Sequence, residues 1–173
     1  MNADELRAAQ APLKTRYRTE PASAIVNLTA SGIPEAPAQV IRVETYLGTV
    51  DAGLHVAVGG DGRQACAGDM LLQALIACAG VTLGSVATAM GITILSGRIW
   101  AEGEIDFRGT LGVSREVPVG FRTLHLHFDI DSDASPEAHQ KLIELSERYC
   151  VVYQTFKQPP AIQSSSNRAA GAP

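Results

Sequence analysis

The sequence predicts an α+β fold, in which strands and helices occupy separate stretches of one chain. Three features carry this prediction: an uncharged stretch over residues 70–97 that contains a long helix, an alternating strand over 123–131 and a capped helix that starts after Ser135. Candidate strands lie on both sides of the first helix, an order that differs from a repeating βαβ series. Of the 173 residues, 46% are apolar and 18% are charged, a composition typical of one folded domain.

The N-terminal third is predicted to hold a lead helix and three strands. The lead helix covers residues 1–14 and is broken by Pro12, which lacks the N–H group that a helix interior needs. The glycine and proline residues of 31–37 predict a loop. Strands are expected over residues 24–28, 39–47 and 54–58.

A long helix is predicted from about Asp69 to Met90, and Gly91 is expected to end it. No charged residue occurs in the 28 positions from Met70 to Gly97, a length that could cross a membrane. Its small and hydroxyl side chains, and the lack of aromatic residues at either end, favour a protein without membrane contact. A helix that is apolar all round must be surrounded, and one domain of this size cannot enclose it. A partner chain is therefore expected, in an obligate homodimer.

Further strands and a second helix are predicted after the long helix. In the strand over 123–131, apolar side chains at even positions alternate with polar side chains at odd positions, as in an antiparallel strand with one buried face. Ser135 and Pro136 form a typical helix start, and this helix is expected over 136–149. The other segments are a strand over 99–108, a loop over 115–120, a last strand over 161–164 and a flexible tail over 164–173, so that the α+β domain covers 15–163.

Charge and cysteine content exclude several classes of protein. Asp and Glu outnumber Lys and Arg by 18 to 14, and the net charge of −4 argues against nucleic-acid binding. Three cysteines are too few for a disulfide scaffold, and no CxxC pair indicates a zinc site. The first residues show no secretory signal, so we expect a cytoplasmic protein whose cysteines act as thiols.

The three cysteines are the residues best suited to carry chemistry. Cys78 lies in the middle of the long helix, beside alanines and a glycine that let another element approach the sulfur. Cys150 lies at the end of the second helix, and Cys66 precedes the long helix, where it is expected to be the most exposed of the three. A buried helical cysteine on its own is usually inert, and a separation of 72 residues does not by itself pair Cys78 with Cys150.

Four segments of the chain occur in an order that is specific as a set. They are GDMLLQALIAC over 68–78, EIDFRGTLG over 104–112, GFR over 120–122 and LSERYCVVYQTF over 145–156. Together, within residues 54–163, they resemble the OsmC/Ohr family of osmotically induced and organic hydroperoxide resistance proteins. The resemblance implies an intertwined homodimer, with antiparallel sheets around a long buried central helix.

The same resemblance implies thiol peroxidase activity toward organic hydroperoxides or hydrogen peroxide, in oxidative-stress defence. Cys78 matches the family's peroxidatic position and Cys150 its resolving position, so a sulfenic acid on Cys78 would condense to a Cys78–Cys150 disulfide. An external dithiol reductant would reduce this bond, and no cofactor is implied. The negative end of the second helix disfavours a thiolate at Cys150, which suits that cysteine to resolving.

In this family an arginine of the N-terminal hairpin activates the thiolate, and a glutamate near the helix start holds the arginine. Asp69 is the acid at the comparable place here, where an ordinary helix-start acid would look the same. Arg42 is the first candidate for the arginine because it lies on a predicted strand, with Arg16 and Arg18 as alternatives. Val151 stands where a proline commonly follows the second cysteine.

Other interpretations of the sequence stay open. A dimer of the same fold could hold a small hydrophobic ligand without reducing it. His125, His127 and Asp129 share one strand face and could meet a metal, although any water-facing strand has this spacing. His55 could line a pocket near the helix entrance or serve a structural role, and the glycines of 59–62 lack the lysine of a phosphate loop.

Overall fold

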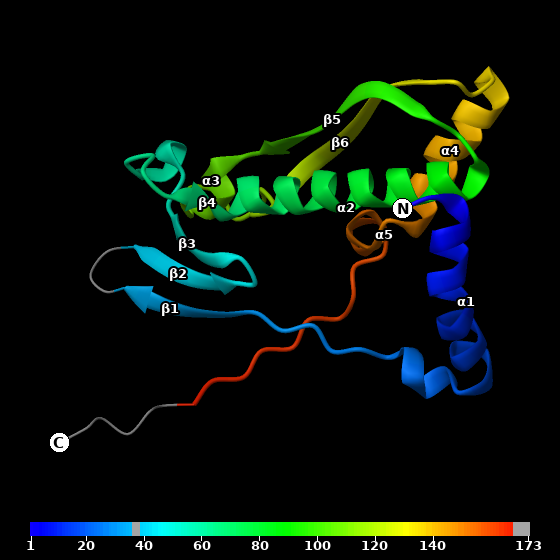
Figure 1. Ribbon diagram of the computed structural model, residues 1–173. Coiled ribbons are helices and arrows are strands. Elements are labelled where there is room, and N and C mark those ends of the chain that lie inside the picture. The colour runs from blue at the N-terminus through cyan, green and yellow to red at the C-terminus, as the bar shows by residue number, and fades with distance from the viewer. Residues whose placement is uncertain (36–38, 168–173) are drawn as a thin grey trace.

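The computed structural model describes residues 1–35 and 39–167 of the chain. Its elements, in chain order, are α1 (Ala3–Thr19), η1 (Pro21–Ala24), β1 (Ser31–Glu35), β2 (Val40–Thr45), β3 (Gly48–Gly53), η2 (Val56–Val58), β4 (Ala65–Cys66), α2 (Ala67–Met90), β5 (Ile94–Ile105), α3 (Phe107–Thr110), β6 (Phe121–Ser132), α4 (Pro136–Tyr149) and α5 (Val151–Lys157). The long helix α2 runs through the molecule, with the β5–β6 hairpin along one side, α4 against its C-terminal half and α5 against its middle (Figure 1).

Two sheets confirm the α+β class that the sequence predicts. In the first sheet, β1, β2 and β3 are antiparallel, and β4 pairs with β3 in parallel just before α2 begins. The second sheet is the antiparallel pair β5 and β6, whose residues pair along almost the whole length of both strands. The predicted strands over 39–47, 99–108 and 123–131 are therefore confirmed, with ends shifted by a few residues.

The core lies where α2, α4 and the inner face of β6 meet. Leu83 and Ala87 of α2 and Leu142 of α4 are buried together, and Phe128 and Ile130 of β6 pack against them. This packing confirms the alternation predicted for residues 123–131, because the even-numbered side chains of β6 face α2. The predicted helix over 136–149 is confirmed as well, and the Ser135 side chain caps it by accepting a hydrogen bond from the Ala138 N–H.

One stripe of α2 is buried and the opposite face is open. Gly91 ends the helix in the left-handed conformation, as predicted, with φ of 71°. The buried stripe faces β5, β6 and α4, whereas Val81 on the opposite face is 74% exposed. By length and composition α2 could span a membrane, and only 22% of its most apolar window is buried within the chain. The burial on nearly all sides that the sequence predicts is therefore not achieved by one chain.

The N-terminal region differs from the prediction in its helix and its first strand. α1 continues past Pro12 to Thr19. Pro12 cannot donate a hydrogen bond to the Ala8 carbonyl oxygen, but Ala8 is exposed and water can solvate this oxygen. A capping box of Asn2 and Glu5 also stabilises the start of the helix. Within the predicted strand over 24–28, residues 25–28 form neither helix nor strand, since no neighbouring segment pairs with them.

The first sheet also contains two strands that the sequence analysis misplaced. The predicted loop over 31–37 is strand β1 as far as Glu35, and residues 36 and 37 lie outside the described residues. Pro34 is tolerated there because β1 is an edge strand. The strand predicted over 54–58 is wrong, because residues 56–58 form the short helix η2. The strand before it is β3, since the tight turn after Thr45, closed by its hydroxyl on the Gly48 carbonyl oxygen at 2.6 Å, folds 48–53 back onto β2.

The C-terminal region contains a helix that the sequence analysis missed. α5 begins directly after Cys150, only one residue after α4 ends. The strand predicted over 161–164 is wrong, because residues 159–167 form neither helix nor strand (Figure 1). Of the predicted flexible tail over 164–173, residues 168–173 lie outside the described residues.

Candidate active site

The start of α5 meets the middle of α2 at Cys78 and Cys150. Cys78 is half-buried on α2, and Cys150 is completely buried, with 0% of its surface exposed. The Cys78 sulfur accepts hydrogen bonds from the backbone N–H groups of Val151 and Val152 and from the Cys150 thiol. The two cysteines that the sequence analysis singled out as a pair are thus brought into direct contact within one chain.

These contacts separate the acidities of the two thiols. Burial acts to raise the pKa of Cys78, but the Val152 N–H, the Cys150 thiol and the further donors around the sulfur outweigh it, so the pKa is lowered. Burial raises the pKa of Cys150, and donation to a Cys78 thiolate raises it further. The arrangement therefore favours a thiolate on Cys78 beside a protonated Cys150, the states that an attacking and a resolving thiol need.

Cys150 belongs to two helices at once. It is the C-cap of α4, with its N–H bonded to the Ser146 carbonyl oxygen at 3.0 Å, and the N-cap of α5, with its sulfur accepting from the Tyr153 N–H at 3.4 Å. From the sequence, only the negative end of α4 is expected at Cys150. The positive end of α5 lies at the same place, and its first N–H groups act on Cys78.

The functional groups that sequence reasoning missed are peptide N–H groups. Val151 and Val152 act through their backbone, so their side chains give no sign of the role. Thr82, one turn after Cys78, also lowers the pKa of Cys78, and its hydroxyl donates to the Cys78 carbonyl oxygen at 2.8 Å. The sequence signal for these donors is the start of α5 at Val151, with Cys150 as its N-cap.

Cys66 does not join this pair. It precedes α2 as its N-cap, twelve residues before Cys78, which is about 18 Å along a helix. Its thiol is half-buried and lines a separate pocket of about 350 Å³. A Cys66–Cys78 disulfide within one chain is excluded by this separation.

The predicted arginines lie away from Cys78 in the single chain. The Arg42 guanidinium binds Asp51 Oδ1 at 3.0 Å and Glu35 Oε1 at 2.8 Å. These acids raise the pKa of Arg42, and the hydrogen bond with Asp51 is the largest cause. Arg16 lies over the Tyr17 ring on α1, and Arg18 is exposed near the end of the same helix. The prediction that Arg42 activates Cys78 is therefore not met within one chain.

The other predicted side chains gather near the start of α2 or on the outer sheet face. Asp69 is exposed in the first turn of α2 and lines the same pocket as Cys66 and His55. His55 has a structural role, since it caps η2 by accepting the Ala57 N–H at 3.0 Å and stacks on Phe107.

The metal hypothesis for the β6 face has no geometric support. His127 stacks on Trp100 with ring centroids 4.6 Å apart, and its Nε2 lies 3.3 Å from Glu102 Oε2. Over residues 1–35 and 39–167, no three His, Cys, Asp or Glu side chains are grouped as metal ligands.

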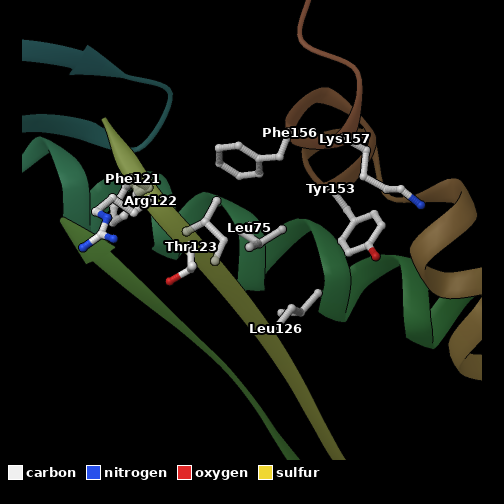
Figure 2. A pocket seen from close by; sticks show the side chains of 9 residues that line it. Leu75, Phe121, Arg122, Thr123, Leu126, Tyr153, Phe156 and Lys157 are labelled. Carbon is white, nitrogen blue, oxygen red and sulfur yellow. The ribbon is translucent and has the colours of Figure 1, made fainter. Parts of the chain in front are cut away.

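A pocket of about 270 Å³ lies between α2, β6 and α5, and neither Cys78 nor Cys150 lines it. Figure 2 shows Leu75 of α2 facing Tyr153 and Phe156 of α5, with Thr123 and Leu126 of β6 on the other side. Leu75 lies one turn before Cys78, and Tyr153 is bonded through its N–H to Cys150. The walls of this pocket are thus mostly apolar, and Leu75 and Tyr153 separate it from the two thiols.

Comparison with known proteins identifies one family. The sequence model of the family described as OsmC-like protein matches residues 60–165. No curated protein sequence matches the chain.

Solved structures match the fold at low sequence identity. An OsmC-like protein from Mycoplasma pneumoniae has a TM-score of 0.65 and 16% identity, covering 78% of this chain and 89% of that one. A Legionella pneumophila protein named organic hydroperoxide resistance protein OsmC has a TM-score of 0.60 and 17% identity, with coverage of 78% and 93%. The organic hydroperoxide resistance protein OhrB of Bacillus subtilis has a TM-score of 0.52 and 16% identity, with coverage of 76% and 93%.

Proposed function

This chain belongs to the OsmC-like protein family, and we propose that it is a thiol peroxidase that reduces organic hydroperoxides or hydrogen peroxide. The observation that carries the proposal is the contact of Cys78, whose pKa is lowered, with the buried thiol of Cys150. The names of the Legionella and Bacillus proteins, which refer to hydroperoxide resistance, support the same chemistry. We place the protein in the cytoplasm, in defence against oxidative stress.

In the first step, the Cys78 thiolate attacks the outer oxygen of the hydroperoxide. The S–O bond forms as the O–O bond breaks, so sulfur is oxidised to a sulfenic acid and the peroxide leaves as an alkoxide, which takes up a proton to become an alcohol. The N–H groups of Val151 and Val152 hold the reacting sulfur as an anion before attack. For hydrogen peroxide the leaving group becomes water.

In the second step, Cys150 attacks the sulfenic acid of Cys78. The Cys150 thiol loses its proton, the S–S bond forms, and the sulfenic oxygen leaves as water. Because the two sulfurs are already hydrogen-bonded, this step requires little movement of α5. An external dithiol then reduces the disulfide by exchange and is itself oxidised to a disulfide, which returns both cysteines to thiols without a cofactor.

We propose that the working unit is a homodimer in which the open face of α2 packs against a second copy. This face carries the short side chains of Ala77, Val81 and Ser85, which are exposed in one chain. Cys78 follows Ala77 at the edge of this face, so a second copy would also shield the reacting sulfur from bulk water.

Arg42 stays our candidate for the activating arginine, contributed by the second copy of the chain. Its hairpin of β2 and β3 projects away from α2 (Figure 1), which suits contact with another chain. Asp69, exposed in the first turn of α2, is the candidate acid that would hold the arginine.

A peroxide-consumption assay with dithiothreitol and with cumene hydroperoxide, tert-butyl hydroperoxide or hydrogen peroxide tests the proposal. We expect saturable turnover and, after stoichiometric oxidation without reductant, one Cys78–Cys150 disulfide per chain with Cys66 reduced. Turnover no faster than the protein-free background with all three peroxides would refute the enzymatic function.

A second candidate function is the binding of a small apolar ligand without reduction, which the apolar pocket beside Leu75 favours. Resistance of Cys78 to alkylation at neutral pH, together with a co-purified ligand in native mass spectrometry, would support this alternative. Rapid alkylation of Cys78 would support the peroxidase.

A further inference from the structure

The break between α4 and α5 frees the N–H groups that reach the candidate active site. The two helices are separated by Cys150 alone, which is extended with φ of −74° and ψ of 111°. In an uninterrupted helix, the N–H groups of the next residues would donate to the carbonyl oxygens four positions back. Instead, the Val151 and Val152 N–H groups donate to the Cys78 sulfur. The same break therefore leaves carbonyl oxygens at the end of α4 without their helical donors.

One of these carbonyl oxygens, that of Glu147, receives a replacement donor from a side chain. In a continuous helix its partner would be the Val151 N–H, which lies on the Cys78 sulfur in this protein. The side-chain amide of Gln154 donates to the Glu147 carbonyl oxygen instead, with Nε2 at 2.9 Å in a partly buried position. Gln154 lies in α5, so this bond joins the two helices across the break.

A second contact holds the same corner. Burial raises the pKa of the Tyr153 phenol most, and the charge of the Glu147 carboxylate and a hydrogen bond to it raise the pKa further. The Tyr153 N–H donates to the Cys150 sulfur at 3.4 Å, and the Gln154 N–H donates to the Cys150 carbonyl oxygen at 2.9 Å. Two successive residues of α5 are thus bonded both to the break and to Glu147.

We infer that Gln154 is a positioning residue, which keeps the Val151 N–H on the Cys78 sulfur by occupying the Glu147 carbonyl oxygen. Without the Gln154 amide, this partly buried oxygen would lack a donor, which raises the free energy of the folded chain. The Val151 N–H would then be drawn back to the oxygen and away from the sulfur. The consequence for turnover rests on the proposed peroxidase function, whereas the consequence for the acidity of Cys78 does not.

The first test measures the rate of Cys78 alkylation by iodoacetamide against pH, in the reduced full-length chain, by peptide mass spectrometry. Gln154→Met keeps an unbranched side chain and removes the donor. We expect the midpoint of its profile to lie about half a pH unit above that of the parent, so that alkylation at pH 7 is about threefold slower. The rate at high pH should equal that of the parent, which separates a change in acidity from unfolding or lost access.

Three further variants separate the bond from packing and charge. Gln140→Met is the matched control, because the exposed Gln140 amide on α4 donates to Glu144 Oε1 at 3.3 Å and its loss should leave the profile unchanged. Glu147→Gln keeps the carbonyl oxygen and should not slow alkylation. Gln154→His keeps an N–H donor and should restore the parent rate at pH 7.5, where the imidazole is mostly neutral.

Three outcomes overturn the inference: an unchanged profile in Gln154→Met, an equal shift in Gln140→Met, or a Gln154→His variant as slow as Gln154→Met.

The second test separates this inference from the proposed function, with cumene hydroperoxide and excess dithiothreitol. We expect Gln154→Met to lower kcat/KM about threefold at pH 7 and to approach the parent at pH 9. A shifted alkylation profile in a protein without turnover would refute the peroxidase and support the role of Gln154 in acidity. Turnover with identical alkylation profiles in parent and variant would overturn that role and leave the peroxidase standing.

Discussion

The thiol of Cys150 donates a hydrogen bond to the sulfur of Cys78, and both groups depart from the acidity of an ordinary thiol. Burial, followed by this donation, raises the pKa of Cys150, whereas the surrounding donors lower the pKa of Cys78 in spite of its burial. The opposite shifts of the two pKa values favour Cys78 as the thiolate and Cys150 as the protonated thiol. Two cysteines in one contact thus become chemically distinct through their neighbours alone.

Replacing Cys78 with serine should reduce peroxide consumption to background, because a hydroxyl at this position cannot supply the thiolate. The Cys66→Ser variant is the control, since Cys66 lies about 18 Å from Cys78 along α2. Both variants should keep the thermal unfolding midpoint of the parent within a few degrees. Full activity of Cys78→Ser, or loss of activity in Cys66→Ser, would mean that a different thiol attacks.

Replacing Cys150 with serine should leave Cys78 able to react once and unable to form the disulfide. We expect a sulfenic acid on Cys78 that a dimedone-type reagent labels, followed by over-oxidation with excess peroxide. Mass spectrometry of the labelled peptides measures the outcome. A disulfide between Cys78 and Cys66 in this variant would contradict the separation of these residues.

Replacing Val152 with proline should raise the pKa of Cys78, because the substitution removes an N–H that donates to its sulfur. Because the pKa of Cys78 is lowered, its thiolate forms at a lower pH than that of an ordinary thiol. The rate of Cys78 alkylation in the parent should therefore begin to increase at a lower pH than for an ordinary thiol. In Val152→Pro the profile should move to higher pH, with a rate at pH 7 about tenfold lower.

The control for this profile is Val152→Ala, which removes side-chain packing but keeps the N–H group. It should follow the parent profile of iodoacetamide alkylation against pH. If the alanine and proline variants shift equally, the effect belongs to packing and the backbone N–H is not the activating group.

Replacing Val81 with glutamate should break the proposed dimer, because a charge would be placed in the middle of the open face of α2. Val113→Glu is the control, since Val113 is 71% exposed in a loop and Val81 is 74% exposed on α2. Sedimentation velocity should show dimers for the parent and the control, and dissociated or unfolded chains for Val81→Glu. A compact folded parent of 18.2 kDa at micromolar concentration would rule out the obligate dimer.

Co-expression tests whether Arg42 acts across the dimer. Arg42→Gln and Cys78→Ser should each lose most or all activity as homodimers. In a mixed dimer, the chain with Cys78 meets a partner with an intact Arg42, so one site should recover. Purification of mixed dimers through two different tags, followed by the peroxide assay, measures this. Inactive mixed dimers would assign Arg42 to its own chain or to a structural role.

Local patterns explain which elements the sequence could predict. The uncharged run and Gly91 define α2, and Ser135 with Pro136 defines the start of α4, because each signal lies within a few residues. α5 was missed because its cap is a cysteine, an uncommon cap residue, and its first two residues are β-branched valines. β3 was missed because its sequence GTVDAG has few apolar residues, and its pairing with β2 holds it.

The sequence could predict the part of the site that consists of cysteine side chains. The family motifs assigned Cys78 and Cys150, and the structure brings them together. The backbone donors of α5 could not be predicted, since every residue except proline has the same N–H group. Arg42 was chosen from its strand alone, and a pairing with Asp51 and Glu35 depends on the register of β1, β2 and β3.

The capping of α5 by the Cys150 sulfur would couple the proposed disulfide to the stability of this helix. When Cys150 bonds covalently to Cys78, its sulfur must turn toward α2, and the Tyr153 N–H that it held at 3.4 Å loses that acceptor. The first turn of a helix of seven residues then has less to hold it. Tyr153 and Phe156 lie on that helix and line the pocket, so the proposed disulfide would weaken the cap that holds both side chains in the pocket wall.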